Sequence, residues 1–114
     1  MDYREFIQLD LPVAVAIVSC GADWRVEEAN AEFTDVLGYT EKELRETRPQ
    51  KMVYDEDYAN LVSVLENVVR THDNGKMQLR IVRPDGITRW VEMRCSVLAH
   101  YDVKPYVVLF LWDI

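Results

Sequence analysis

The side chains that could act as nucleophile, acid or base are few and scattered along the 114-residue chain. His72 and His100 both lie at the edges of predicted loops, and no serine or cysteine has a predicted base beside it. Nucleophilic catalysis needs a nucleophile and a base within hydrogen-bond reach of each other. We therefore predict that the chain is not an enzyme.

Two groups of acidic residues are the remaining source of a general base. Glu27 and Glu28 fall in a predicted strand, and residues 55–57 (Asp-Glu-Asp) stand at a predicted helix N-terminus. Solvated charge and a favourable interaction with the helix dipole explain these positions more simply. A small α+β enzyme that uses one of these carboxylates as its base is kept only as a third alternative.

The two cysteines, Cys20 and Cys95, lie far apart and lack the paired spacing of a zinc site. They provide no disulfide framework, which fits a reducing compartment. We interpret both as small core residues and predict no metal site.

The charge balance excludes further kinds of partner. The formal net charge is −7, so the long-range field of the chain opposes binding to nucleic acid or to an anionic membrane. The longest apolar runs are too short to span a bilayer as helices, and the acidic start lacks the regions of a signal peptide. We predict a cytoplasmic domain without direct membrane insertion, in a parent protein that other segments could attach to a membrane.

Hydrophobic periodicity predicts the elements that would position a site. Continuous apolar runs and alternating patterns predict strands at 13–20, 24–29, 76–82, 87–100 and 106–112. Short helices and one longer amphipathic helix at 56–71, capped by Asp55, separate the first two strands from the last three. This order predicts the α+β class, with a five-stranded antiparallel sheet and short helices on one face. We expect residues 1–11 to form an amphipathic lead-in and residues 12–114 to form one domain.

The stretch NAEFTDVLGYTEKEL, residues 30–44, predicts two short helices separated at a glycine. Asn30 can cap the first helix, and Gly38 stands where a left-handed C-terminal residue is favoured. Thr40 and Glu43 have the spacing of a capping box for the second helix.

Three motifs resemble those of a known family. The pattern N-x-x-F-x-x-x-x-G-Y-T-x-x-E-L resembles the signature of PAS domains, here at Asn30, Phe33, Gly38, Tyr39, Thr40, Glu43 and Leu44. RPDGITRWVE, in which RPDG predicts a type I turn, is similar to the C-terminal motif of these domains. LFLWDI is similar to the strand that ends them. The three motifs follow the order and spacing of the family over essentially the whole chain.

The resemblance implies a module that senses a small ligand or a partner and relays the signal to a C-terminal output domain on the same chain. Such output domains are commonly a histidine kinase, a diguanylate cyclase or a transcription regulator. Asp113 resembles the exit aspartate of the family, so we expect the signal to leave there. The alternative function is a ligand-free module for protein–protein interaction and dimerisation.

The resemblance also bears on cofactors. Light-sensing members carry a cysteine in the helix after the opening motif, but that region here reads RPQKMVYDEDY, which argues against flavin of the cysteine-adduct type. Heme-binding members use a histidine on the longest helix. His72 falls at the end of that helix, where an exposed turn histidine is the simpler interpretation. The cofactor, if any, stays unknown.

The fold of the family implies a lining for a ligand pocket. It would turn the following residues toward the space between sheet and helices: Ile17, Ser19, Tyr54, Tyr58, Leu61, Leu65, Leu79, Ile81, Val91, Met93, Cys95, Leu109 and Leu111. A ligand pocket usually mixes apolar walls with a few convergent polar groups, and this lining has few of them. It predicts either a small apolar ligand or a closed core.

The outer face of the sheet is also predicted to be apolar. Ala14, Ala16 and Val18 of the first strand, and the alternate residues of the last strand, would need cover there. We predict a homodimer through the lead-in and this face, with candidate contacts Phe6, Ile7, Leu9, Val108, Phe110 and Trp112. The alternative is a lead-in that folds over the face as a lid within one chain.

Overall fold

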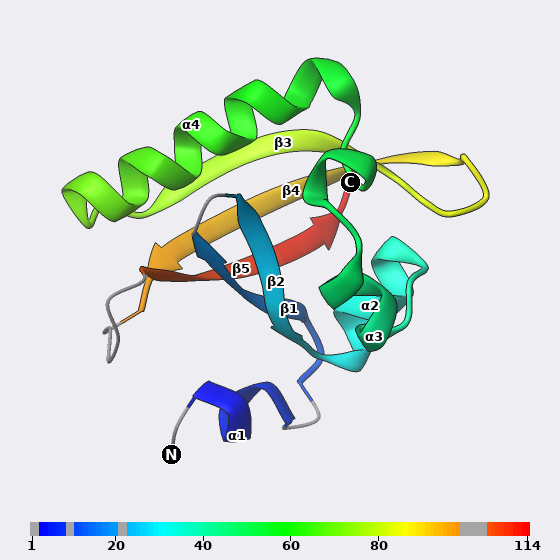
Figure 1. The fold of residues 1–114 in the computed structure, drawn as a ribbon, viewed down its shortest axis with the longest axis horizontal. Helices are drawn as coiled ribbons and strands as arrows, with labels where there is room; N and C mark the ends of the chain where they lie inside the picture. The colour runs from blue at the N-terminus through cyan, green and yellow to red at the C-terminus, as the bar shows by residue number, and fades with distance from the viewer. Residues whose placement is uncertain (1–2, 9–10, 21–22, 99–104) are drawn as a thin grey trace.

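The computed structural model describes residues 3–8, 11–20, 23–98 and 105–114. Its elements in chain order are α1 (Tyr3–Gln8), β1 (Ala14–Cys20), β2 (Trp24–Ala29), α2 (Ala31–Leu37), α3 (Glu41–Glu46), the 3₁₀ turn η1 (Pro49–Lys51), α4 (Asp55–Thr71), β3 (Gly75–Val82), β4 (Thr88–Val97) and β5 (Tyr106–Asp113). Figure 1 shows α2, α3 and α4 grouped around the curved sheet.

The strands form one five-stranded sheet in the order β2-β1-β5-β4-β3, and every neighbouring pair is antiparallel. The predicted α+β class and sheet are confirmed. The predicted fourth strand ends earlier than expected, at Val97 rather than residue 100. His100 and most of the predicted loop after it lie outside the described residues.

Two hydrophobic clusters lie on opposite faces of the sheet. The larger one, on the side of α2, α3 and α4, includes Ala14, Ala16 and Val18 of β1. The smaller one joins Val15 and Ile17 of β1 to α1. The prediction had exchanged these two faces of β1. A strand that is buried on both faces has a continuous apolar sequence. Such a sequence does not alternate between polar and apolar residues, so it does not indicate which residues face the helices.

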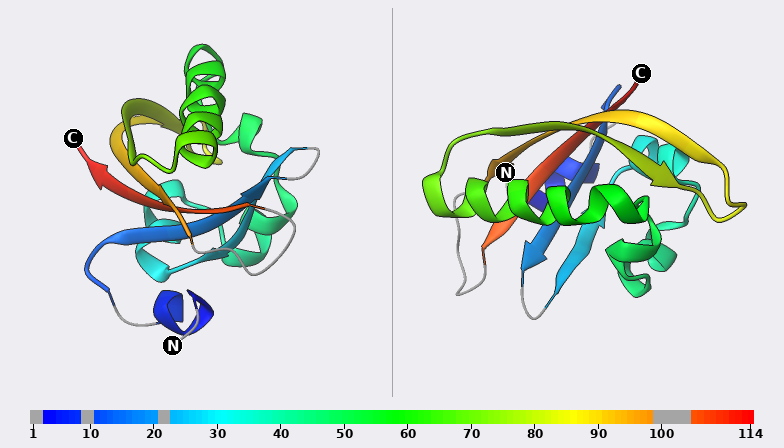
Figure 2. Two further views of the ribbon diagram at one scale, coloured as in Figure 1. Left: turned by 90° about the vertical axis from the view of Figure 1, so that its left-hand side faces the viewer. Right: turned by 90° about the horizontal axis from the view of Figure 1, so that it is seen from above.

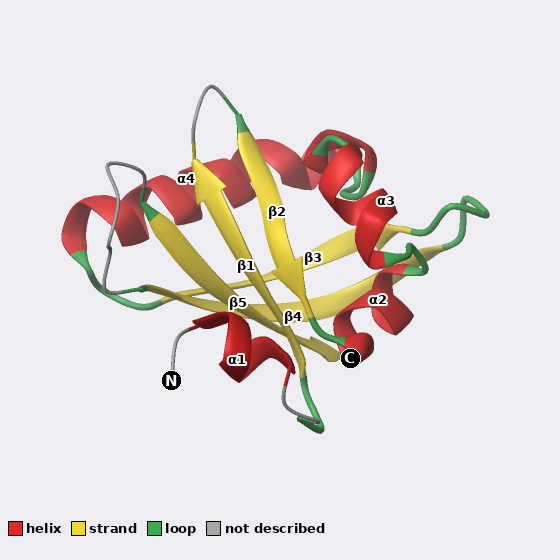
Figure 3. Cartoon of the chain, turned by 60° about the horizontal axis from the view of Figure 1, so that its bottom comes forward, coloured by secondary structure: helices red, strands yellow, loops and turns green. Residues whose placement is uncertain are grey.

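Helix α1 covers part of the outer face. Ile7 is buried in the smaller cluster together with Val108 of β5. Figure 2 shows α1 on the side of the sheet opposite α4, and Figure 3 shows it in front of the strands. Within one chain α1 thus packs on the outer face, a position that both the predicted dimer and the alternative of a lid without dimerisation allow. Leu9 lies outside the described residues.

The helix ends follow local sequence signals. Gly38 ends α2 in the left-handed region with φ of 81°, and Thr40 with Glu43 forms the predicted capping box of α3. The predicted cap of α4 was wrong by one residue, since Asp55 is the first helical residue and Tyr54 precedes the helix without a side-chain cap. The backbone N–H of Tyr54 instead donates to the Arg80 carbonyl of β3.

Candidate ligand cavity and its anchors

A cavity of about 70 Å³ lies between the inner face of the sheet and the helices. Its accessible wall is entirely apolar. The lining comes from every strand, from α2 and α4, and from the η1 region: Val18, Trp24, Val26, Phe33, Leu37, Pro49, Met52, Val53, Tyr58, Leu61, Val62, Leu65, Leu79, Ile81, Met93, Leu109 and Leu111. The cavity is thus built into the larger hydrophobic cluster.

The structure brings most of the predicted pocket residues to this cavity. Those that line it are Tyr58, Leu61, Leu65, Leu79, Ile81, Met93, Leu109 and Leu111. Val91 and Cys95 are buried in the same cluster but do not reach the cavity, and burial raises the pKa of the Cys95 thiol. Their strand β4 contributes only Met93 to the wall.

Three predicted pocket residues lie elsewhere. Ile17 belongs to the cluster under α1, on the outer face, because the faces of β1 were exchanged in the prediction. Ser19 is two residues beyond Ile17 in the same strand and so lies on the same face of the sheet. Its buried hydroxyl donates to a carboxylate oxygen of Glu27. Tyr54 lies before α4, with its ring 3.9 Å from the guanidinium carbon of Arg80. These three positions are corrections to the predicted lining.

The prediction missed the walls contributed by β2 and α2. Trp24 and Val26 alternate with half-buried residues along β2, and both line the cavity. Phe33 and Leu37 stand four positions apart on α2 and form another wall. Both patterns are visible in the sequence, but only the three-dimensional packing assigns them to the cavity rather than to solid core.

Asn30 anchors the start of α2 to the sheet. Its Oδ1 accepts from the backbone N–H of Phe33 and of Val15, each at 3.0 Å. Its Nδ2 donates to the Val13 carbonyl at 2.8 Å. Only 6% of Asn30 is exposed, so these bonds are sheltered from water. One side chain thus caps the helix and ties it to β1, which fixes the wall that carries Phe33.

Arg83 anchors the other end of α2. Its Nη1 donates to the carbonyls of Asp35 at 2.9 Å and Val36 at 2.7 Å, in the last turn of the helix. A helix leaves its last carbonyls without partners inside the helix, so a guanidinium satisfies them and complements the helix dipole. The hairpin between β3 and β4 thereby holds α2 in place.

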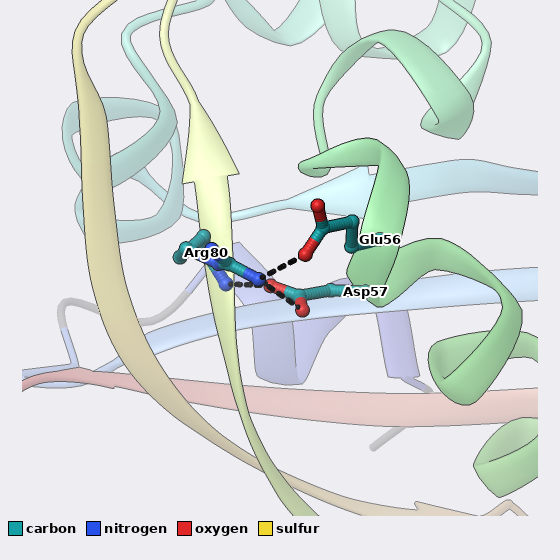
Figure 4. A network of polar contacts seen from close by, with 3 residues as sticks. All are labelled: Glu56, Asp57 and Arg80. Atoms are coloured by element: carbon teal, nitrogen blue, oxygen red, sulfur yellow. Dashed lines mark hydrogen bonds and ion pairs between the residues drawn. The ribbon is translucent and has the colours of Figure 1, made fainter.

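A charged cluster anchors the start of α4 to the edge strand β3 (Figure 4). Asp57 accepts from Arg80 Nε at 3.0 Å, from Nη2 at 2.9 Å and from the backbone N–H at 2.8 Å. Glu56 lies 3.7 Å from the same guanidinium. The hydrogen bonds from Arg80 hold the pKa of Asp57 below its ordinary value, and Asp57 in turn raises the pKa of Arg80.

Trp90 completes this cluster from β4, with its ring 4.9 Å from the Arg80 guanidinium carbon. From the sequence, the acidic residues 55–57 were predicted to be solvated charge that interacts with the helix dipole, and the pair of Asp57 with Arg80 was not predicted. Asp57 and Arg80 are 23 residues apart, so no local spacing could reveal them. Because both carboxylate oxygens of Asp57 accept hydrogen bonds from the Arg80 guanidinium, the role of Asp57 is that of an ion-pair partner.

The lining does not fit the cofactors considered from the sequence. It contains neither a cysteine for a flavin adduct nor a histidine for heme iron. His72 ends α4 as an exposed residue in the left-handed region, away from the cavity. A volume of about 70 Å³ is also far below the size of either cofactor. Within the described residues there is no cluster of three or more metal-binding side chains.

Comparisons with known proteins agree on one fold. A family model described as the PAS fold matches residues 26–110. A PAS domain from a two-component sensor histidine kinase is 17% identical with a TM-score of 0.77, over 98% of this chain and 93% of that one. The PAS domain of a Colwellia psychrerythraea protein is 15% identical with a TM-score of 0.79, over 98% and 94%.

A Rhodobacter sphaeroides LOV protein is 16% identical with a TM-score of 0.81, over all of this chain and 69% of that one. A search of curated proteins found no match to the chain. None of the helices in the described residues combines the length and apolar character needed to cross a membrane.

Proposed function

The chain belongs to the PAS fold family, and from this premise we propose that it is a sensory module for a small uncharged apolar molecule. In this proposal the ligand binds in the cavity between sheet and helices, and its presence is relayed to an output domain on the same chain. The output would be a histidine kinase, a diguanylate cyclase or a transcription regulator. The proposal assigns no catalytic step to the chain, and Cys20 and Cys95, which are not joined in a disulfide, fit a cytoplasmic setting.

The observation that carries the proposal is the apolar wall of the cavity. A polar group that enters such a space loses its hydrogen bonds to water without replacement, at a cost of about 2–7 kcal/mol. A charged group would cost more. Uncharged apolar molecules lose no hydrogen bonds to water when they enter the cavity. The apolar wall therefore favours them over carboxylates, sugars or nucleotides.

The volume limits the ligand further. An engineered apolar cavity of about 150 Å³ accepts benzene or xenon, so a cavity of about 70 Å³ suits roughly three to five non-hydrogen atoms. At the ceiling of about 1.5 kcal/mol per atom, five atoms give about 7.5 kcal/mol, a low-micromolar Kd at best. The proposed sensor therefore responds to abundant small molecules, unless the helical layer widens around a larger one.

A thermal-shift series tests this function. Short haloalkanes are compared with carboxylates of the same length, in the wild type and in the cavity-filling variant Val26→Ile. We expect the haloalkanes, and not the carboxylates, to raise the Tm of the wild type, and to leave the Tm of Val26→Ile unchanged. Val97→Ile, which changes a half-buried valine outside the lining, is the matched control and should respond as the wild type does. Equal responses of Val26→Ile and the wild type would contradict binding in this cavity.

The outer face favours a second function, a module for dimerisation. Trp90 is 50% exposed and Trp112 43% exposed, although large aromatic side chains are usually more buried. Phe110 stacks on Trp112 with ring centroids 6.2 Å apart, and Arg94 lies 5.7 Å from the Trp112 ring. This surface continues the cluster that α1 covers, since Phe110 packs against that cluster.

We propose a homodimer that uses Phe6, Phe110 and Trp112 of this outer face. Ile7 and Val108 were also candidates, but Ile7, on the sheet-facing side of α1, and Val108 of β5 are both buried in the smaller cluster and cannot reach a partner unless α1 moves. The molar mass of the wild type in solution, measured by light scattering, should be that of two chains, and Trp112→Lys should halve it. Ile87→Lys, at an exposed apolar residue of the β3–β4 turn, should not. A monomeric wild type whose mass is unaffected by deleting residues 1–10 would refute the dimer.

A further inference from the structure

The exposure of the lining residues locates the mouth of the cavity. All of them are buried except Tyr58 and Val62, which are half-buried. These two residues stand four positions apart on α4, so they share one helix face on successive turns. Among the described residues, the cavity therefore approaches the surface along this face of α4.

The start of β2 forms the other side of the mouth. Trp24 lines the cavity from β2 and is itself buried. Tyr58 and Val62 of α4 line the same cavity as Trp24 of β2, which points to an opening between the N-terminal half of α4 and the beginning of β2. Burial, and after it the charge of Asp23, raises the pKa of Tyr58.

The Tyr58 ring is held at this opening by packing. Its side chain lines the cavity, and no hydrogen bond joins its hydroxyl to another described residue. A side chain that only packs can change rotamer without breaking a polar contact. The ring can therefore move while the backbone of α4 stays in place.

The other walls are fixed by polar anchors. Asn30 and Arg83 hold the two ends of α2, and the Asp57–Arg80 pair holds the first turn of α4. Displacing either helix would break buried or part-buried hydrogen bonds and leave their polar groups without partners, which is costly. Rotation of one side chain is the cheaper way to open the cavity.

We propose that Tyr58 is the gate of the cavity, and that small uncharged molecules enter and leave between α4 and β2 as its ring turns aside. This inference rests on the proposed function, which states that the cavity binds such molecules, and it adds the residue that controls their exchange. Tyr58 sets the rates of binding and release, and the apolar wall sets which molecules are held.

Xenon is a suitable probe because it is uncharged and enters small apolar cavities. Methyl NMR of Val18, Leu61 and Leu65, which line the cavity, reports both its affinity and its exchange rate. The variants are Tyr58→Ala, which removes the gate, and Val62→Phe, which narrows the same opening. Tyr58→Phe keeps the ring, and Tyr106→Ala removes a half-buried tyrosine from the outer face as a matched control.

We expect Tyr58→Ala to raise the association and dissociation rates of xenon about tenfold, the equivalent of a barrier lowered by about 1.4 kcal/mol. Val62→Phe should slow both rates, Tyr58→Phe, which keeps the ring, should change them less than Tyr58→Ala does, and Tyr106→Ala should match the wild type. Rates that are the same in Tyr58→Ala, Val62→Phe and the wild type, with xenon still bound, would overturn the gate and leave the proposed function intact. No xenon-dependent methyl shift in the wild type or Tyr58→Ala would overturn both.

Discussion

Single polar side chains hold the cavity walls in place, although the walls themselves are apolar. Asn30 satisfies backbone groups of the β1 region and of α2 at once, and Asp57 does the same for a side chain and a backbone N–H of β3. A buried backbone group without a partner costs about as much as a lost hydrogen bond. Asn30 and Asp57 therefore help to position the cavity walls although neither residue lines the cavity.

Replacing Asn30 tests this at the scale of one residue. Asn30→Ala leaves the Val15 and Phe33 N–H groups and the Val13 carbonyl without their partner. We expect the free energy of unfolding to fall by about 2–4 kcal/mol, measured by urea denaturation. Asn60→Ala, at an exposed position of α4, is the control and should change it by less than about 0.5 kcal/mol. A similar effect of both substitutions would contradict the anchoring role.

The pair of Asp57 and Arg80 predicts a pH dependence. The pKa of Asp57 is lowered in the folded state from an ordinary value of 3.8, chiefly by the hydrogen bonds from Arg80. A lowered pKa stabilises the fold fully above the unfolded value, and this contribution is lost as the pH falls through the folded value. We expect the wild type to exceed Asp57→Asn in unfolding free energy at pH 7, and the difference to shrink as the pH falls below 3.8 and through the lower pKa that Asp57 has in the folded state.

The control for this measurement is Glu66→Gln, which removes an exposed carboxylate from the same helix. A difference between wild type and Asp57→Asn that stays constant from neutral pH into strong acid would show that the carboxylate charge is not the source of the effect.

At the scale of elements, the helical layer consists of short helices bent along a curved sheet. Gly38 lets the chain leave α2 with φ of 81°, and the space around it is filled by the β3–β4 hairpin. A Cβ at Gly38 would lie 3.1 Å from Arg83 and from Pro84. The glycine therefore allows both a left-handed backbone and the close approach of the hairpin that caps α2.

Two glycine substitutions separate these effects. Gly86 has a similar φ of 85°, but a Cβ there would meet no atom within 4 Å. Gly86→Ala should cost about 1–2 kcal/mol of unfolding free energy, from the left-handed backbone alone. Gly38→Ala should cost more, because it also displaces Arg83 from the end of α2. Equal losses in thermal or chemical denaturation would show that the hairpin contact does not matter.

At the scale of the whole molecule, the sheet separates two surfaces with different proposed roles. The inner face and helices enclose the cavity, whereas the outer face carries α1 and the exposed tryptophans. Strand β5 contributes to both, through Leu109 and Leu111 on one side and Val108 and Phe110 on the other. Strand β5 thus joins the cavity to the outer face, and it ends at Asp113.

Asp113 is the proposed exit of the signal, and its surroundings allow a clean test. It pairs with Arg89 at 2.6 Å, with side chains 51% and 40% exposed. An exposed ion pair contributes at most about 1 kcal/mol, so Asp113→Ala should keep the fold, the Tm within a few degrees and any ligand affinity. In the protein that carries an output domain, we expect this variant to uncouple output activity from the ligand. Output that still follows the ligand would refute the exit role.

The sequence alone determined the features that depend on near neighbours. The caps at Asn30, Gly38 and Thr40 follow from residue types a few positions apart, and the alternation in β3 and β4 follows from the period of a strand. Together with the three motifs, these local signals were sufficient for the fold class and the family. Eight residues of the predicted lining reached the cavity for the same reason, because helix and strand periods fix which face they occupy.

Only the tertiary structure determined the features that depend on residues far apart in the sequence. β1 is apolar on both faces, so only its packing against α1 shows that Ile17 points outward and Val18 inward. The Asp57–Arg80 contact joins residues 23 positions apart, and it forms only when α4 lies against the edge of the sheet. The position of Tyr58 at the mouth depends on exposure, a property of the assembled surface. Long-range packing therefore defines the site, because its walls come from elements that meet only in the folded chain.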